Sequence, residues 1–76
     1  MNLTKCKLNA FFVIDDFYGQ VPTKIKRRLL DLGFTKGQRV KVLRKSILGK
    51  VFLVEIRKFV LSLREEVAQY VLVEGK

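Results

Sequence analysis

Apolar and polar residues alternate along several short segments of the chain, a pattern typical of strands that bury one face. The alternation is clearest in the segments 51–56 and 59–63. Other segments rich in β-branched or aromatic residues complete a set of five strands at 11–17, 40–45, 51–56, 59–63 and 70–74. In the two clearest strands, the residues expected to face the core are Phe52, Val54, Ile56, Phe59, Leu61 and Leu63.

One segment follows the spacing of a helix instead. Ile25, Leu29 and Leu32 recur every three or four residues between positions 23 and 32, so a helix with a single apolar stripe is expected there. Gly33 follows directly, and glycine is favoured just past a helix end because it accepts positive φ. The sequence therefore predicts one helix between the first and second strands.

The residues after this helix predict how it ends. In a Schellman ending, Phe34 would pack one turn back against Leu29. We therefore assign Leu29, Leu32 and Phe34 to the contact between the helix and the rest of the fold. Lys36 and Gly37 suit the centre of a type II turn, because Gly37 takes positive φ without steric cost. A strand is expected to follow at once.

Two later connections are also predicted. Arg57-Lys58 is the expected turn between the third and fourth strands, but it lacks the Gly or Asn that two-residue hairpins favour, which leaves a wider loop open. Ser62 and Glu65 have the spacing of a capping box, in which each side chain satisfies an amide at the start of a helix. A short helical turn through Ala68 is expected to follow.

These elements together predict a fold class. A flat sheet of five short strands would leave its edges and one apolar face uncovered. We therefore expect a mainly β fold, a small SH3-like barrel of about five strands with one helix after the first strand and a short helical turn before the last. The chain has 76 residues, of which 49% are hydrophobic, so a single packed domain over 1–76 is expected.

The numbers of histidine and cysteine residues limit which catalytic groups the chain can form. The chain has no His and one cysteine, Cys6, which removes the usual general base and every Ser/His or Cys/His pair. We expect no enzymatic activity, no catalytic residue and no cofactor. Cys6 is expected to be an ordinary reduced thiol, although Lys5 and Lys7 beside it could lower its pKa. The lone thiol and the short apolar run at 10–14 predict a cytoplasmic protein with no signal peptide or membrane span.

A metal site would depend on the carboxylates Asp15, Asp16, Asp31, Glu55, Glu65, Glu66 and Glu74. Asp15 and Asp16 are neighbours in a predicted strand, where successive side chains leave opposite faces unless the strand breaks. Glu65 already has a capping role. We therefore expect no metal site within the chain.

The segment 28–37, Arg-Leu-Leu-Asp-Leu-Gly-Phe-Thr-Lys-Gly, resembles the FeoA family, whose hallmark is an Arg-Leu helix ending in Leu-Gly-apolar, two residues and then Gly. The resemblance continues through 40–44, Leu48-Gly49, 61–68 and 71–74. Many members have Pro and Asp where this chain has Ile47 and Lys50, and Gly where it has Lys58. These differences bear on the loop shapes rather than on the fold.

The resemblance implies an SH3-like domain of the bacterial cytoplasm that assists FeoB, a membrane ferrous iron transporter with a cytosolic GTP-binding domain. Related domains occur at the C-terminus of iron-dependent repressors, but no helix-turn-helix precedes the barrel here. The expected function is therefore that of a cytosolic accessory or regulatory protein of ferrous iron uptake that binds the cytosolic part of FeoB.

Positive charge is concentrated in one region. The net charge is +9, and the segment 24–58 alone carries twelve cations against two acids. Lys24, Lys26, Arg27 and Arg28 crowd the first half of the predicted helix, where the macrodipole is already positive and each exposed cation costs about 0.3–1 kcal/mol. Such an arrangement is expected of a surface that binds an acidic partner, and equally of a merely solvated basic face.

Three partners fit this charge. They are the FeoB GTP-binding domain, the anionic inner face of the membrane, to which the protein would attach peripherally, and nucleic acid. Proteins that bind single-stranded nucleic acid usually add exposed aromatic side chains. Phe34, Phe52 and Phe59 are expected in the core, and only Tyr18 and Tyr70 stay unassigned. A small nucleic-acid-binding barrel is therefore the less favoured alternative function.

Overall fold

The computed structural model describes residues 1–75. Along the chain it contains η1 (Leu3–Lys5), β1 (Phe11–Phe17), α1 (Thr23–Asp31), β2 (Arg39–Lys45), β3 (Val51–Ile56), β4 (Phe59–Arg64), α2 (Glu65–Ala68) and β5 (Val71–Gly75). The order of predicted elements is confirmed, and no boundary predicted for a strand or for α1 differs by more than one residue. The short helix η1 was absent from the prediction.

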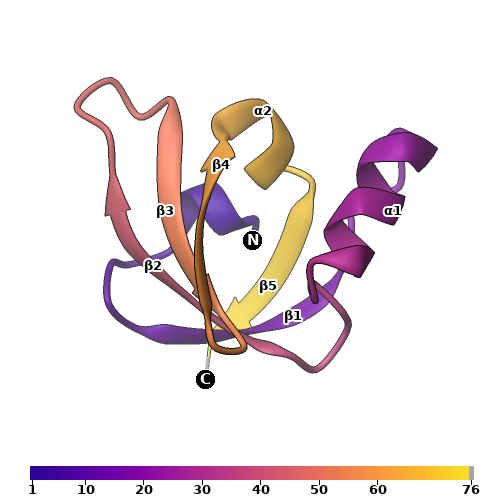
Figure 1. Cartoon of the computed structure of the whole chain (residues 1–76), viewed down its shortest axis with the longest axis horizontal. Coiled ribbons are helices and arrows are strands. Elements are labelled where there is room, and N and C mark those ends of the chain that lie inside the picture. The colour runs from indigo at the N-terminus through magenta and orange to yellow at the C-terminus, as the bar shows by residue number, and fades with distance from the viewer. Residues whose placement is uncertain (76) are drawn as a thin grey trace.

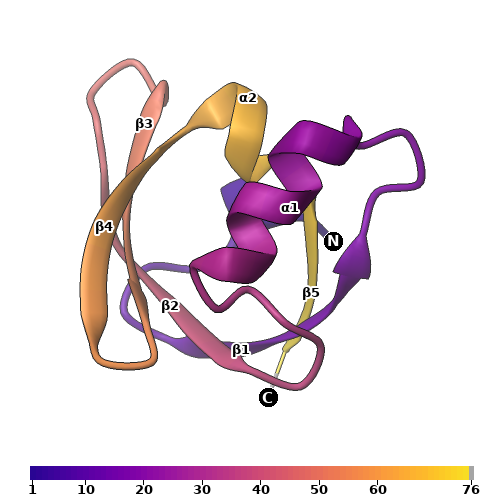
Figure 2. The same ribbon diagram turned by 45° about the vertical axis from the view of Figure 1, so that its right-hand side comes forward.

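All five strands belong to one antiparallel sheet with the order β4-β3-β2-β1-β5. The register shifts between Ile14 and Asp16 in β1 and between Val42 and Arg44 in β2. Bulges of this kind bend a strand and increase its twist. Figures 1 and 2 show the resulting curvature, with the sheet curled round a common interior and α1 outside it.

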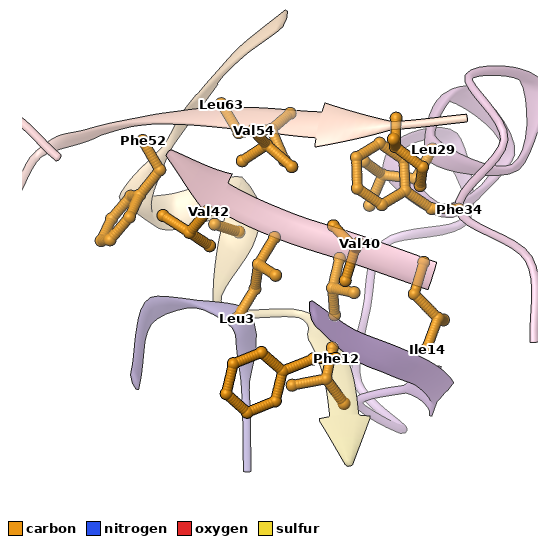
Figure 3. Packing of buried hydrophobic residues seen from close by; sticks show 14 residues of the cluster. Leu3, Phe12, Ile14, Leu29, Phe34, Val40, Val42, Phe52, Val54 and Leu63 are labelled. Carbon is orange, nitrogen blue, oxygen red and sulfur yellow. The ribbon is translucent and has the colours of Figure 1, made fainter. Parts of the chain in front are cut away.

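Alternate residues of the strands fill that interior (Figure 3). The buried set comprises Leu3, Phe12, Ile14, Leu29, Phe34, Val40, Val42, Phe52, Val54, Ile56, Leu63, Ala68, Val71 and Val73. The predicted period of two is thus confirmed in β3, where Phe52, Val54 and Ile56 all point inward. Leu3 comes from η1 and is fully buried, so the N-terminal segment belongs to the core.

The end of α1 has the predicted geometry. Gly33 has φ +104°, its N–H donates to the Leu30 carbonyl at 3.0 Å, and the Phe34 N–H donates to the Leu29 carbonyl at 3.0 Å. These two bonds define a Schellman ending. Leu29 and Phe34 are buried at 1% and 0% exposure. The assignment of Leu32 to the same contact is wrong, because Leu32 is the C-cap residue and its side chain is 39% exposed.

Both predicted tight turns are present. Gly37 has φ +89°, and the Gln38 N–H donates to the Thr35 carbonyl at 3.0 Å, which confirms the turn centred on Lys36 and Gly37. The β3–β4 hairpin has a two-residue loop, because Ile56 pairs with Phe59.

The residue Arg57 is unusual within that hairpin. It has φ +57° at the first central position, where a type II′ turn ordinarily has glycine. Its side chain lies over the end of α1, and a Cβ atom added to Gly33 would sit 2.6 Å from Arg57 Cδ. The absence of a side chain at Gly33 therefore leaves space for the Arg57 side chain of the β3–β4 hairpin.

Two expectations about β4 are wrong. Ser62 lies within β4, which continues to Arg64, and Arg64 is the N-cap residue of α2 without a side-chain cap bond. The start of α2 is held instead by the Glu65 N–H, which donates to the Lys50 carbonyl at 2.8 Å. Phe59 was assigned to the core but is 62% exposed, because it closes the hairpin at the edge strand of the sheet.

Candidate functional site

The first half of α1 presents cations without acidic partners. Lys24, Lys26, Arg27 and Arg28 are all exposed. The helix begins after Pro22, with no side-chain cap and no acidic residue in its first turn. Within residues 1–75, the ion pairs are Lys50–Glu65 and Arg64–Glu66, so none of the four helix cations is paired there. Their charge adds to that of the free helix amides instead of being neutralised.

The structure brings three of these four residues together. Lys24, Arg27 and Arg28 lie one turn apart and line a shallow depression with Ile25 and Asp31. Their spacing of three and four residues places them on one face of the helix. We call Lys24, Arg27 and Arg28 the helix basic surface. Figure 2 shows α1 on the outside of the molecule, in front of the curled sheet.

Lys26 does not belong to this group. Its Nζ lies 5.9 Å from the centroid of the Phe17 ring, at the end of β1. At this distance the negative face of the ring still attracts the ammonium group. Lys26 therefore has a local contact of its own, on another side of the helix from Arg27 and Arg28.

A second group of cations surrounds an aromatic ring on the outer face of the sheet. The guanidinium carbon of Arg39 lies 4.0 Å and Nζ of Lys41 lies 4.1 Å from the centroid of Phe11. An acidic residue shares this face, since Glu55 of the neighbouring strand lies opposite Lys41 in the β2–β3 register. Sequence reasoning missed the group, because only the register of β1 on β2 places Phe11 opposite Lys41. Its mixed charge makes it a weaker candidate than the helix basic surface.

Exposed aromatic side chains are more numerous than expected, but they are dispersed. Tyr18 is 50% exposed and lines a shallow hollow with Tyr70, whereas Phe59 lies beside Arg57 and Asp31 at the β3–β4 hairpin. Neither hollow includes a residue of the helix basic surface. The described residues thus form no continuous stacking platform along the basic helix.

The carboxylates do not assemble a ligand set. Among residues 1–75, no three His, Cys, Asp or Glu side chains lie close enough together to hold a metal ion. The strand does bulge between Ile14 and Asp16. Asp16 Oδ1, however, accepts a 2.7 Å hydrogen bond from the Phe17 N–H, which occupies that carboxylate locally.

Cys6 is a half-buried thiol packed against the core. Burial raises its pKa to about 11, although the positive N-terminus acts in the opposite direction. Desolvation of the thiolate outweighs the effect of the N-terminus, so the alternative in which a lowered pKa makes Cys6 reactive is not supported.

This pKa predicts slow alkylation. Near neutral pH, Cys6 should react with iodoacetamide about a hundredfold more slowly than free cysteine, because the thiolate is the nucleophile. The rate should rise with pH up to a pKa of about 11. Mass spectrometry of quenched samples measures the rate, and the same protein in urea is the control. A folded protein that reacts as fast as the unfolded one would contradict the assignment.

Within the described chain, no helix has the length and apolar character needed to cross a bilayer.

Comparison with known proteins identifies the family. A family model described as the FeoA domain matches residues 1–75, whereas no curated protein matches the chain. The solution structure of FeoA from Chlorobium tepidum is 28% identical with a TM-score of 0.87, over 99% of this chain and 70% of that one. The crystal structure of Stenotrophomonas maltophilia FeoA complexed with zinc, described as an SH3 domain protein, is 30% identical with a TM-score of 0.85, over 97% of this chain and 89% of that one.

The same fold occurs in larger proteins. A manganese-dependent transcriptional repressor superposes on the whole chain with a TM-score of 0.87 at 18% identity, and the chain spans 41% of that repressor. This likeness concerns the fold alone. The family match over nearly the full chain confirms the membership that the sequence resemblance implies. The likeness to a FeoA structure described as an SH3 domain confirms the predicted fold class. The chain therefore belongs to the FeoA domain family of proteins associated with ferrous iron transport.

Proposed function

We propose that this protein is an accessory factor of ferrous iron uptake that binds the cytosolic GTP-binding part of FeoB through the helix basic surface. The observation that carries the proposal is the cluster of Lys24, Arg27 and Arg28, which are exposed and unpaired within residues 1–75. Cations at a helix N-terminus work against helix stability. An acidic partner offsets that cost, which supports a binding role.

The protein then acts by contact, as an accessory domain of this family. Cations on an exposed helix mainly raise the rate of encounter with an acidic surface and select its orientation. Binding to the cytosolic part of a membrane transporter places the protein in the cytoplasm, at the inner face of the membrane.

Charge reversal tests the surface. The variant Lys24→Glu/Arg27→Glu/Arg28→Glu is expected to bind a FeoB cytosolic fragment at least about tenfold more weakly at low salt. Its thermal stability should be equal or higher, because acidic residues in the first turns suit the helix dipole. Isothermal titration calorimetry measures the affinity, and circular dichroism measures the melting temperature.

The matched control is Lys5→Glu/Lys7→Glu/Lys36→Glu, which changes the net charge equally at exposed positions outside the first half of α1. Equal losses in both variants would mean that only net charge matters, and unchanged affinity in the first would remove the helix basic surface from consideration. The nucleic-acid alternative predicts instead that the wild type binds generic RNA with a steep salt dependence. A gel-shift titration at two salt concentrations distinguishes the two functions.

A further inference from the structure

The tip of the β2–β3 hairpin exposes two large apolar side chains. Ile47 is 102% and Leu48 is 81% exposed, the two highest values among the exposed large hydrophobic residues of the described chain. Leaving such side chains in water costs hydrophobic free energy. In Figures 1 and 2 the hairpin projects away from the body of the molecule, at a distance from α1. Nothing in the described chain covers this tip.

The tip is an ordered turn. The Gly49 N–H donates to the Ser46 carbonyl at 2.8 Å, and Ser46 Oγ accepts the N–H groups of Lys50 and Val51 at 3.0 and 3.1 Å. Gly49 has φ +69°, which glycine adopts without strain. Ile47 and Leu48 therefore occupy the two central positions of a β-turn. Because this loop is already folded, little conformational entropy is lost when its apolar residues are buried.

Cations flank the apolar pair on both strands. Arg44 and Lys45 precede the turn and Lys50 follows it, and all three are exposed. Lys50 Nζ lies 3.8 Å from Glu65 Oε1, but both side chains are at least half exposed, so the pair is weak and can exchange partners. The tip thus combines a protruding apolar pair with three long basic side chains.

We propose that this tip, formed by Ile47 and Leu48 with Arg44, Lys45 and Lys50, inserts into the interface of an anionic lipid bilayer. The apolar pair enters the boundary between headgroups and acyl chains, while the basic side chains contact lipid phosphates. A convex tip can insert into a bilayer without a complementary pocket. The long basic side chains can still contact the headgroups while the apolar residues are buried below them.

This inference does not depend on the proposed function. It concerns a different element, and in both views the tip of the β2–β3 hairpin and α1 lie in separate parts of the molecule. The hairpin would hold the protein at the membrane while the helix basic surface stays free for a protein partner.

Vesicle flotation tests the proposal with the full chain. The wild type should float with vesicles of phosphatidylcholine and phosphatidylglycerol, and much less with phosphatidylcholine alone. The variant Ile47→Ser/Leu48→Ser should lower the partition coefficient by about tenfold or more. The matched control Val60→Ser alters a residue that is 57% exposed on the edge strand β4 and should float like the wild type.

A fluorescence reporter detects insertion directly. The chain has no Trp, so Leu48→Trp introduces a single indole at the tip. Its emission should shift to shorter wavelength with anionic vesicles and be quenched by brominated acyl chains. Val60→Trp should show neither effect.

Three outcomes would overturn the proposal. The first is flotation of Ile47→Ser/Leu48→Ser equal to that of the wild type. The second is loss of flotation only in the charge-reversed helix variant, which would assign lipid binding to α1. The third is an unshifted Leu48→Trp spectrum with vesicles but a shifted one with a FeoB cytosolic fragment, which would make the tip a protein contact.

Discussion

Replacing Phe34 by alanine is expected to lower the free energy of unfolding by about 3–5 kcal/mol. Phe34 is fully buried, and Figure 3 shows its ring beside Leu29, near the end of β3. Removing the ring leaves a cavity where the residues that end α1 pack into the core. Urea denaturation followed by circular dichroism measures the change.

The control is Phe59→Ala, which removes the same side chain from a position that is 62% exposed. It should cost about 1 kcal/mol or less. A domain of this size has only about 5–10 kcal/mol of stability in total, so Phe34→Leu serves as a milder second variant. Equal losses in Phe34→Ala and Phe59→Ala would contradict the assigned burial.

The second large effect is expected for Leu29→Ala, which should cost about 2–5 kcal/mol. Leu29 is 1% exposed, whereas Leu30 and Leu32 in the same helix segment are 40% and 39% exposed. Leu30→Ala and Leu32→Ala make the same chemical change and should each cost about 1 kcal/mol or less. Melting temperatures of the three variants test the ranking, and a loss in Leu32→Ala as large as that in Leu29→Ala would contradict it.

These variants also separate stability from function. If Phe34→Ala or Leu29→Ala abolishes partner binding, the loss reports unfolding of the domain. Charge reversal on the helix basic surface should leave folding intact. A binding assay therefore has to be paired with a melting curve for every variant.

Much of the fold could be predicted from local patterns. Alternation identified the inward residues of β3, and Gly33 with Phe34 identified the helix end, because both depend on neighbours in sequence. Alternation shows which face a residue occupies, but it does not show how far the core extends along that face. Phe59 faces the core side at the hairpin end and is 62% exposed.

Helical spacing has the same limit. Leu32 continues the stripe of Ile25 and Leu29, but it is the C-cap residue and its side chain is 39% exposed. The capping box failed for a different reason. Its Ser62 pairs with Leu53 in the sheet, so pairing with β3 overrode the local signal for a helix start.

The candidate sites were only partly visible in the sequence. The basic helix could be predicted because its four cations fall within the five residues 24–28. Their division, with Lys26 turned toward Phe17, depends on how α1 lies against β1. The pairing of Phe11 with Lys41 likewise needed the register of two strands. Ile47 and Leu48 lie between two expected strands, at 40–45 and 51–56, but their full exposure emerged only from the projecting hairpin.

The contact between Gly33 and Arg57 has an evolutionary consequence. A Cβ atom at position 33 would meet the Arg57 side chain at 2.6 Å, and the backbone there has φ +104°, which L side chains rarely adopt. Shortening the side chain at position 57 removes the contact but leaves this backbone conformation unchanged. Across descendants of this chain, glycine should therefore persist at position 33 even where the side chain at position 57 has been shortened.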